Sequence, residues 1–505
     1  MQSSLYLDFL HPENMKYLIL TISLFYFSNT RGQQHDNTWM LSQEYGNLST
    51  QVEFLPTVTT DTAIRNLKIS KTNLTVSDSL GNLLFYTNGI KIYNTQYQLM
   101  QNGNGLNPGQ LATNSTNGYP YVEAITSIPH PVQANKYYVF HQGVSYSSAL
   151  DGFAEKLYYT LVDMNANGGL GRVDKKNQVL LENDSMCVGQ LEVVKHGNGR
   201  DWWLIQPMAY SNGYYIFLIA DSTITYHHKQ YIGNVSLHDS EFIGQATFTH
   251  QGDKYFRYDQ ENDLDMFDFD RCTGYLANYE HIPVQDSADN VAGGFFMGVA
   301  VSPNDRYLYV SSYIYMYQFD LWASNIASTR DTVGVYDNHL HIGIFQTFFG
   351  SIQTAPDGKI YSVSFGSPYL HVINNPNVGG VGCDVVQRGQ NLLFINSHIP
   401  NFPHYRTPAL SGSACDTITS IETVETPEKE IQIYPNPTSG LVYIEAVQEI
   451  EQLSIHDALG RKVYWYHQPR QQGITLDTQQ WDNGIYYISI WLDGKIVQEK
   501  IHVLR

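Results

Sequence analysis

The sequence predicts an all-β protein with two parts: a β-propeller, for which we expect seven blades, and a small β-sandwich at the carboxyl end. Helical periodicity is nearly absent between residues 34 and 418. In that region a unit recurs that consists of an apolar strand, a Gly/Asp/Asn turn and an aromatic-rich strand. Residues 431–505 carry a separate series of short alternating strands, which defines the second part.

Length and charge limit the kind of partner that the protein can have. The chain has 505 residues, which is ample for a large core, and a formal net charge of −19 with only 29 Lys and Arg residues. Nucleic-acid binding depends on clustered Lys and Arg, and so does binding to anionic membrane surfaces. The composition therefore argues against nucleic-acid partners and against such membranes.

The first element, residues 1–32, is predicted to be a secretory signal peptide. Met15-Lys16 is followed by an apolar run at 17–27 and a polar stretch at 28–32, and the apolar run is too short for a membrane span. Residues 1–14 lack the basic start of such a leader, so we expect Met15 to be the true initiator. Maturation is expected near Gly32-Gln33, and no other run predicts a transmembrane segment in the mature chain.

The second element, residues 33–418, is predicted to be the propeller. The repeated units recur every roughly 45–55 residues, a spacing typical of four-stranded blades that stack radially to bury both faces. Tight turns such as Pro303-Asn304-Asp305 and Pro356-Asp357-Gly358 precede the aromatic strands. A seventh blade is expected to combine residues 38–58 with residues 392–408, so that strands from both ends close the ring. An array of β-sandwiches is the alternative.

Several stretches of this region resemble known repeat families. They are Ser77-Asp78, Gly81 to Gly89, Met100 to Gly103, Phe269 to Gly274, Ser302 to Tyr309 and Ala355 to Tyr361. The last two look like WD-like or quinoprotein-like propeller repeats, and the others are similar to the amino-terminal region of exported Bacteroidota proteins. The resemblance implies a fold and carries over no catalytic residue.

The third and fourth elements are a linker at 419–430 and the tail at 431–505. The linker is rich in Thr, Glu and Pro with few bulky side chains. The tail opens on an apolar strand that ends in a Pro-Asn-Pro turn, and later turns separate its further strands. The residues that mark these turns and strands are Tyr434, Pro435, Asn436, Pro437, Gly440, Asp457, Gly460, Gly484 and Tyr486, with Lys500 near the end. Gly484 is expected to form a turn before a core strand.

In this order and spacing, the tail resembles the type A C-terminal sorting domain of proteins exported by the Bacteroidota type IX secretion system. The resemblance implies that the secretion machinery is a partner and that the protein passes through the periplasm and outer membrane to the cell surface or the medium. It also implies removal of the tail after transit. A generic appended β-sandwich is the alternative.

The chain has four cysteines: Cys187, Cys272, Cys383 and Cys415. An even count in an exported protein indicates disulfides, and three pairings are open. No Cys-x-x-Cys pair is present, which argues against a zinc ribbon or a redox motif.

The search for chemistry finds weak candidates only. The nucleophile, metalloprotease and phosphate-loop motifs are absent. The acidic run 259–270 is compatible with calcium, but it lacks the loop glycine and is better explained as an exposed acidic strand. His339 and His341 form a metal pair only if a third ligand exists. Trp202-Trp203 suits sugar stacking, although one core and one surface residue is the commoner arrangement.

These observations favour a non-enzymatic exported propeller that binds a protein or a glycan and needs no cofactor or metal. The alternative is a secreted hydrolase or lyase whose acids lie in the propeller channel, since propellers host both kinds of function. The ligand, the disulfide pairing and the mode of surface attachment are left open by the sequence.

Overall fold

A computed structural model describes residues 33–42, 48–64, 67–145, 153–235, 244–259, 262–284, 297–364, 366–396, 398–416, 431–458, 461–492 and 495–504. The expected signal peptide, the expected linker and Gly460 lie outside these ranges. The chain divides into two compact units, Met1–Ile418 and Thr419–Arg505. In the described part of the chain, no helix has the length and apolar character needed to cross a membrane.

The first unit is a ring of antiparallel sheets. The first sheet holds β1 (Thr38–Ser42), β2 (Leu48–Glu53) and β3 (Thr59–Ile64). An eight-stranded sheet follows, made of β4 (Leu74–Ser77), β5 (Leu83–Thr87), β6 (Lys91–Asn94), β7 (Leu99–Asn104), β8 (Ile125–Pro129), β9 (Lys136–Gly143), β10 (Phe153–Asp163) and β11 (Arg172–Cys187). Its two four-stranded halves are joined by one parallel pairing of Gln101 with Arg172.

Four-stranded sheets make up most of the rest of the ring. They are β12 (Glu192–Lys195), β13 (Trp202–Pro207), β14 (Gly213–Ala220) and β15 (Thr223–Tyr231); β16 (Gly244–Phe248), β17 (Lys254–Asp259), β18 (Asp263–Asp270) and β19 (Tyr275–Ile282); β20 (Gly298–Val301), β21 (Tyr307–Ser312), β22 (Tyr315–Asp320) and β23 (Asp331–Val335); and β26 (Ile352–Thr354), β27 (Ile360–Val363), β28 (Ser367–Ile373) and β29 (Val385–Asn396). The short elements are the hairpin β24 (Leu340–His341) and β25 (Phe345–Gln346), the helix α2 (Gln110–Asn114) and the 3-10 turns η2 (Asn167–Gly169), η3 (Ala327–Thr329) and η4 (Gly380–Cys383).

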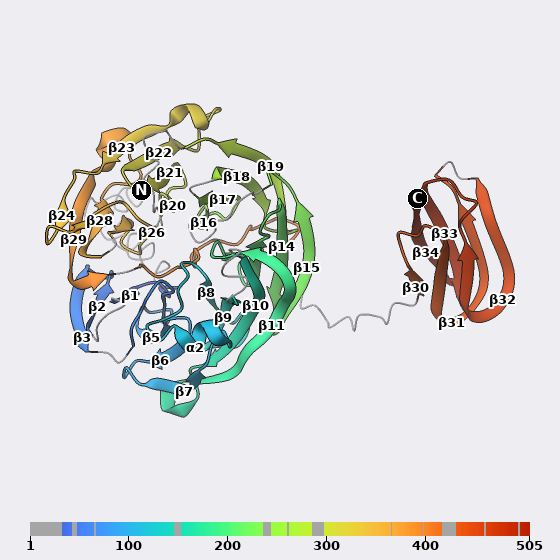
Figure 1. Cartoon of the computed structure of the whole chain (residues 1–505), viewed down its shortest axis with the longest axis horizontal. Helices are drawn as coiled ribbons and strands as arrows, with labels where there is room; N and C mark the ends of the chain where they lie inside the picture. Colours follow the sequence, from blue (N-terminus) through green and yellow to red (C-terminus); the bar gives the residue numbers. More distant parts are fainter. Residues whose placement is uncertain are drawn as a thin grey trace, which may run out of the picture. The chain divides into compact units, whose positions relative to one another are not determined.

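This arrangement is a β-propeller. In each four-stranded sheet, and in each half of the eight-stranded sheet, the first strand lies near the centre of the ring and the last strand lies at the rim (Figure 1). Neighbouring inner strands contact one another, as β1 does with β4 and β16 does with β20. The strands of the inner layers are covered on both faces, so their burial is continuous and does not alternate; β21, for example, is buried throughout.

The ring does not close by the strand exchange that the sequence predicts. Residues 38–64 form the first sheet alone, and β29 belongs to the last sheet. Closure comes instead from packing of β29 against β1, β2 and β3, where the Leu393 amide donates to Thr50 Oγ1 at 3.1 Å. The residues after β29 leave the rim and run inward (Figure 1).

Two further expectations are wrong in detail. Trp202 and Trp203 are both buried, because successive side chains of β13 point to opposite faces and each face packs on a different core cluster. The acidic strand β18 is only partly exposed. Asp265 is buried, where it accepts hydrogen bonds from Tyr279 Oη at 2.9 Å and His281 Nδ1 at 3.1 Å, whereas Asp270 is exposed.

The second unit is an all-β domain of five strands: β30 (Ile431–Tyr434), β31 (Leu441–His456), β32 (Lys462–Asp477), β33 (Gly484–Leu492) and β34 (Lys495–Val503). The long strand β31 pairs with β30 and β32 along its first half and with β32 and β33 along its second. The strands therefore wrap one apolar cluster, whose centre includes Ile444, Leu453 and Ile488.

Candidate functional site

A strap formed by residues 398–416 runs through the middle of the propeller. Asn401 Nδ2 donates to the carbonyl of Leu191, the residue before inner strand β12, at 3.5 Å. The Leu410 amide donates to the carbonyl of Gly197, beyond the other end of β12, at 2.7 Å. The strap therefore passes along the inner strands from the face where they begin to the face where they end.

Apolar side chains of the strap fill the centre of the ring. Ile399, Phe402 and Tyr405 are buried in a core cluster that also contains Trp39 and Trp202. Tyr405 Oη donates to the Ser127 carbonyl at 2.8 Å, which satisfies the one polar atom of its ring. Because the strap occupies the place where a propeller holds a channel, the sheets and the strap share one core.

Arg271 fixes the far end of the strap. Its guanidinium is buried and donates to four backbone carbonyls: those of Lys195 at 2.8 Å, Gln251 at 2.8 Å, His196 at 3.2 Å and Pro408 at 2.6 Å. The planar fork of five N–H donors suits this task, since no other side chain reaches so many acceptors. One residue thus ties two sheets to the strap.

A disulfide also holds this end. Cys415 of the strap is bonded to Cys272 in the turn between β18 and β19, with a Cα–Cα distance of 5.4 Å. Gly197 lies against the bond, and a Cβ at that position would collide with the Cys415 sulfur. Cys187 and Cys383 are buried and form no disulfide.

Nonreducing peptide mapping of the secreted protein is expected to find the Cys272–Cys415 cross-link and thiols at Cys187 and Cys383. The reason is geometric, because only one pair of cysteines is bonded in the described chain. Four free thiols, or a cross-link that includes Cys187 or Cys383, would contradict this pairing. Reduction without unfolding provides the control for alkylation efficiency.

Two glutamates lie where the inner strands begin. Glu192 is buried, and burial raises its pKa well above the usual range, with a further contribution from the nearby charge of Glu123. Burial also raises the pKa of Glu123, whose Oε2 accepts a hydrogen bond from the Ala246 amide at 3.3 Å. Burial therefore favours the neutral form of both carboxyls relative to exposed glutamates.

The histidines suggested as metal ligands do not converge. His341 is half-buried and packs edge-on against Tyr369, while the His339 amide donates to Asp337 Oδ1. His404 of the strap is half-buried, lies against His250 and donates to the Phe248 carbonyl through Nε2, and desolvation lowers its pKa well below the usual range. Within the described ranges, no group of three or more His, Cys, Asp or Glu residues is placed to hold a metal.

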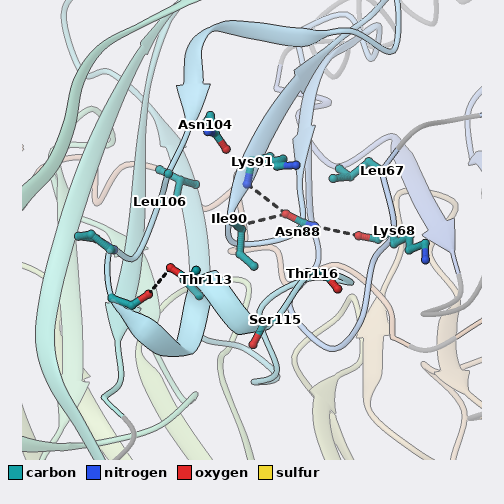
Figure 2. Close-up of a pocket in the computed structure, with 14 residues that line it drawn as sticks. Leu67, Lys68, Asn88, Ile90, Lys91, Asn104, Leu106, Thr113, Ser115 and Thr116 are labelled. Atoms are coloured by element: carbon teal, nitrogen blue, oxygen red, sulfur yellow. Dashed lines mark hydrogen bonds between the residues drawn. The ribbon is translucent and has the colours of Figure 1, made fainter.

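A pocket of about 550 Å³ opens beside α2, away from the strap (Figure 2). Its walls come from the segment before β4, the β5–β6 turn, the end of β7 and α2. The lining residues are Leu67, Lys68, Asn88, Ile90, Lys91, Asn104, Gly105, Leu106, Pro108, Gly109, Ala112, Thr113, Ser115 and Thr116. No local pattern in the sequence indicates that these segments meet, although Asn88 lies within the repeat-like stretch from Gly81 to Gly89.

In the tail, most of the motif residues hold turns together. Asn436 Nδ2 donates to the Lys500 carbonyl at 2.7 Å, and its Oδ1 accepts from the His502 amide at 2.8 Å, so the Pro435 to Pro437 turn is tied to β34. The Gly440 carbonyl accepts from Thr478 Oγ1 at 2.6 Å.

Asp457 and Tyr486 act in the same way. Asp457 Oδ1 accepts from the Arg461 amide at 2.9 Å, and its carboxylate pairs with the Arg461 guanidinium at 2.6 Å across the β31–β32 turn. Tyr486 is buried, and its hydroxyl donates to the Asp482 carbonyl at 2.9 Å. Gly484 has a positive φ of 159°, a backbone conformation that L side chains rarely adopt, so glycine is favoured there although no atom lies near its Cβ position.

Tyr434 and Lys500 are exposed in the tail. Tyr434 stacks on Tyr443 with ring centroids 5.8 Å apart. The Lys500 ammonium lies 5.8 Å from the ring centroid of its cross-strand neighbour Tyr487. Both residues offer side chains that a partner can reach without disturbing the core.

Solved structures resemble the chain only distantly. A protein from Lactobacillus plantarum has 13% identity and a TM-score of 0.42, covering 72% of this chain and 97% of its own. The Cps50 (Swd1) β-propeller domain of Myceliophteria thermophila has 10% identity and a TM-score of 0.35, covering 66% of this chain and 91% of its own. A streptogramin B lyase has 9% identity and a TM-score of 0.32, with 68% and 82% covered. No curated protein matches the chain significantly.

Fold and tail together define the class: a β-propeller followed by a separate all-β domain. Residues 432–504 match the family described as "Secretion system C-terminal sorting domain", and the tail belongs to it. The sorting-domain prediction is confirmed. The protein is therefore a cargo of type IX secretion that is released or displayed at the cell surface.

Proposed function

We propose that this cargo is a binding protein that acts outside the cell and does no chemistry. The observation that supports this most is the strap, because Ile399, Phe402 and Tyr405 occupy the centre where the enzyme alternative needs its active site. The pocket beside α2 lies apart from the strap and is open to a ligand. A pocket of this size is better suited to bind a glycan than to bind the flat surface of a protein partner.

We infer the following organisation for the chain. A signal peptide in residues 1–32, with Met15 as initiator, takes it across the inner membrane of a Bacteroidota cell. Residues 33–418 form a seven-bladed propeller, counted with the two halves of the eight-stranded sheet as separate blades. Residues 419–430 are a linker, and residues 431–505 are the sorting domain, in which exposed Tyr434 and Lys500 are the side chains that the machinery contacts.

The test is glycan-array binding of the full secreted protein. Thr116→Trp places a large ring at the pocket rim and is expected to weaken binding about tenfold or more. Thr225→Trp, on the exposed part of rim strand β15, is the matched control and should bind as the parent does. Equal binding by both variants would show that the pocket is not the site.

The enzyme alternative is favoured by one observation, the two glutamates with raised pKa values, because perturbed carboxyls are common in active sites. The variant Glu192→Gln distinguishes a binding protein from an enzyme. Since a neutral carboxyl and an amide have similar shape and charge, the variant should fold and bind normally if the protein is a binder. Turnover of a glycoside or polyuronide panel by the parent, lost in Glu192→Gln, would establish the enzyme instead.

A further inference from the structure

The Asn88-Gly89 turn builds the pocket beside α2 and sets two lysines on its wall. Asn88 is buried, and its Nδ2 donates to the Lys68 carbonyl at 2.9 Å. Its Oδ1 accepts from the amides of Ile90 and Lys91, each at 3.1 Å (Figure 2). One side chain therefore holds the backbone of both lysines, which come from segments on either side of β4 and β5.

The turn itself has little freedom. Gly89 has φ of 80°, in the left-handed region, and a Cβ there would lie 2.7 Å from Tyr119 Cβ. Asn107 Nδ2 donates to the Gly89 carbonyl at 3.1 Å, which fixes the opposite wall. The two lysines thus project from a preorganised frame, and a ligand bound there has little backbone to order.

The charge of the pocket is opposite to that of the protein. Lys68 and Lys91 are half-buried, and neither ammonium has a hydrogen-bond or ion-pair partner among the described residues. No Asp or Glu is among the described residues that line the pocket, although the chain carries a net charge of −19. Two unpaired cations on one wall of an otherwise acidic protein favour an anionic ligand.

The remaining surface of the pocket suits a sugar. Half-buried Ile90 supplies an apolar surface, against which the C–H face of a pyranose ring can pack, whereas Leu106 is fully buried. Asn104 lies opposite Lys91 in the β6–β7 register, and its side-chain amide has no hydrogen-bond partner among the described residues. The Thr116 hydroxyl is also without an internal partner in the described chain.

We propose that this pocket binds an anionic saccharide, with Lys68 and Lys91 contacting a carboxylate or sulfate and Asn104 and Thr116 contacting hydroxyls. The inference rests on the proposed binding function and specifies its ligand class. Carboxylated and sulfated sugars share the chemistry, so the experiment distinguishes them.

The test is isothermal titration of the full secreted protein with four probes: a galacturonic acid trimer, a sulfated galactose trimer, a neutral galactose trimer and triglutamate. One or both acidic sugars are expected to bind at least about tenfold more tightly than the neutral trimer. Their affinity should fall as NaCl is raised, because salt screens exposed charges. The acidic trimer that binds shows whether the anionic group of the ligand is a carboxylate or a sulfate.

Lys68→Gln and Lys91→Gln should each weaken binding of the acidic trimer about fivefold to tenfold, since each removes one charge-assisted contact. Lys175→Gln is the matched control, because Lys175 is an exposed lysine of β11 outside the pocket. Equal binding of neutral and acidic trimers, blocked by Thr116→Trp, would overturn the anionic ligand and leave the binding function intact. If only triglutamate binds, or if no probe binds, the proposal that the ligand is a saccharide is wrong.

Discussion

Deletion of residues 431–505 is expected to leave the propeller folded and to stop it in the periplasm. A signal peptide carries a chain across the inner membrane only, so a second address is needed for the outer membrane. The tail is a sorting domain of the secretion family, and it forms a compact unit of its own. Cell fractionation should therefore find the deletion variant almost wholly in the periplasm, with a surface level reduced at least about tenfold. Undiminished surface protein would mean that the tail is not the address.

The folded state of the retained propeller is the internal control. The strap, its disulfide and Arg271 all lie before residue 418, so residues 33–418 keep every contact that closes the ring. The periplasmic form should resist protease and keep the Cys272–Cys415 bond. A molten, protease-sensitive product would show instead that the propeller needs the tail in order to fold.

Single substitutions in the tail should separate recognition from folding. Lys500→Ala removes an exposed ammonium over Tyr487 and leaves the core intact, so any loss of export would report recognition. Asn436→Ala breaks two hydrogen bonds between the Pro-Asn-Pro turn and β34, and should impair export through loss of local order. Gly484→Val places a β-branched side chain where φ is 159°, so it should impair export through local misfolding of the tail, even though its Cβ position is open.

Local chemistry made most of the propeller predictable. At residues 355–359, Gly358 supplies a positive φ of 81° and its amide donates to the Ala355 carbonyl at 3.0 Å, which closes the hairpin between β26 and β27. Asp357 Oδ1 accepts from the Lys359 amide at 3.1 Å and completes the turn. Such turns and the alternation of the strands depend on residues that are close together in the sequence, so a single sequence predicts them.

The strap and the pocket depend on contacts between residues far apart in the chain. Asn73 Nδ2 donates to the carbonyl of His398, which lies 325 residues away. The strap has neither the alternation of a strand nor the period of a helix, so no local pattern indicates that it runs through the centre of the ring. The sequence equally showed Asn88 as a turn residue, and no local pattern indicates that its amide would join Lys68 to Lys91.

Replacement of Arg271 is expected to cause the largest loss of stability in the propeller. Arg271→Ala removes the donors of four backbone carbonyls in a buried place, and each unsatisfied group costs about 1–3 kcal/mol. Relaxation and entry of water will recover part of this, so we expect a loss of about 3–5 kcal/mol in the free energy of unfolding. The melting midpoint should fall by about 5 °C or more.

The loss should begin at the strap, because Arg271 is the residue that binds Pro408 to both neighbouring sheets. Limited proteolysis of Arg271→Ala should cut within residues 398–416 before any other site, while the disulfide keeps the fragments joined until reduction. Arg271→Lys keeps the charge but reaches fewer carbonyls, so it should be intermediate. Arg172→Ala is the matched control, since Arg172 is exposed and, among the described residues, its guanidinium pairs with Asp174 alone, and it should cost under about 1 kcal/mol. If Arg271→Ala is as stable as this control and its strap is not cut, the disulfide and the buried apolar side chains of the strap hold the strap in place without the guanidinium.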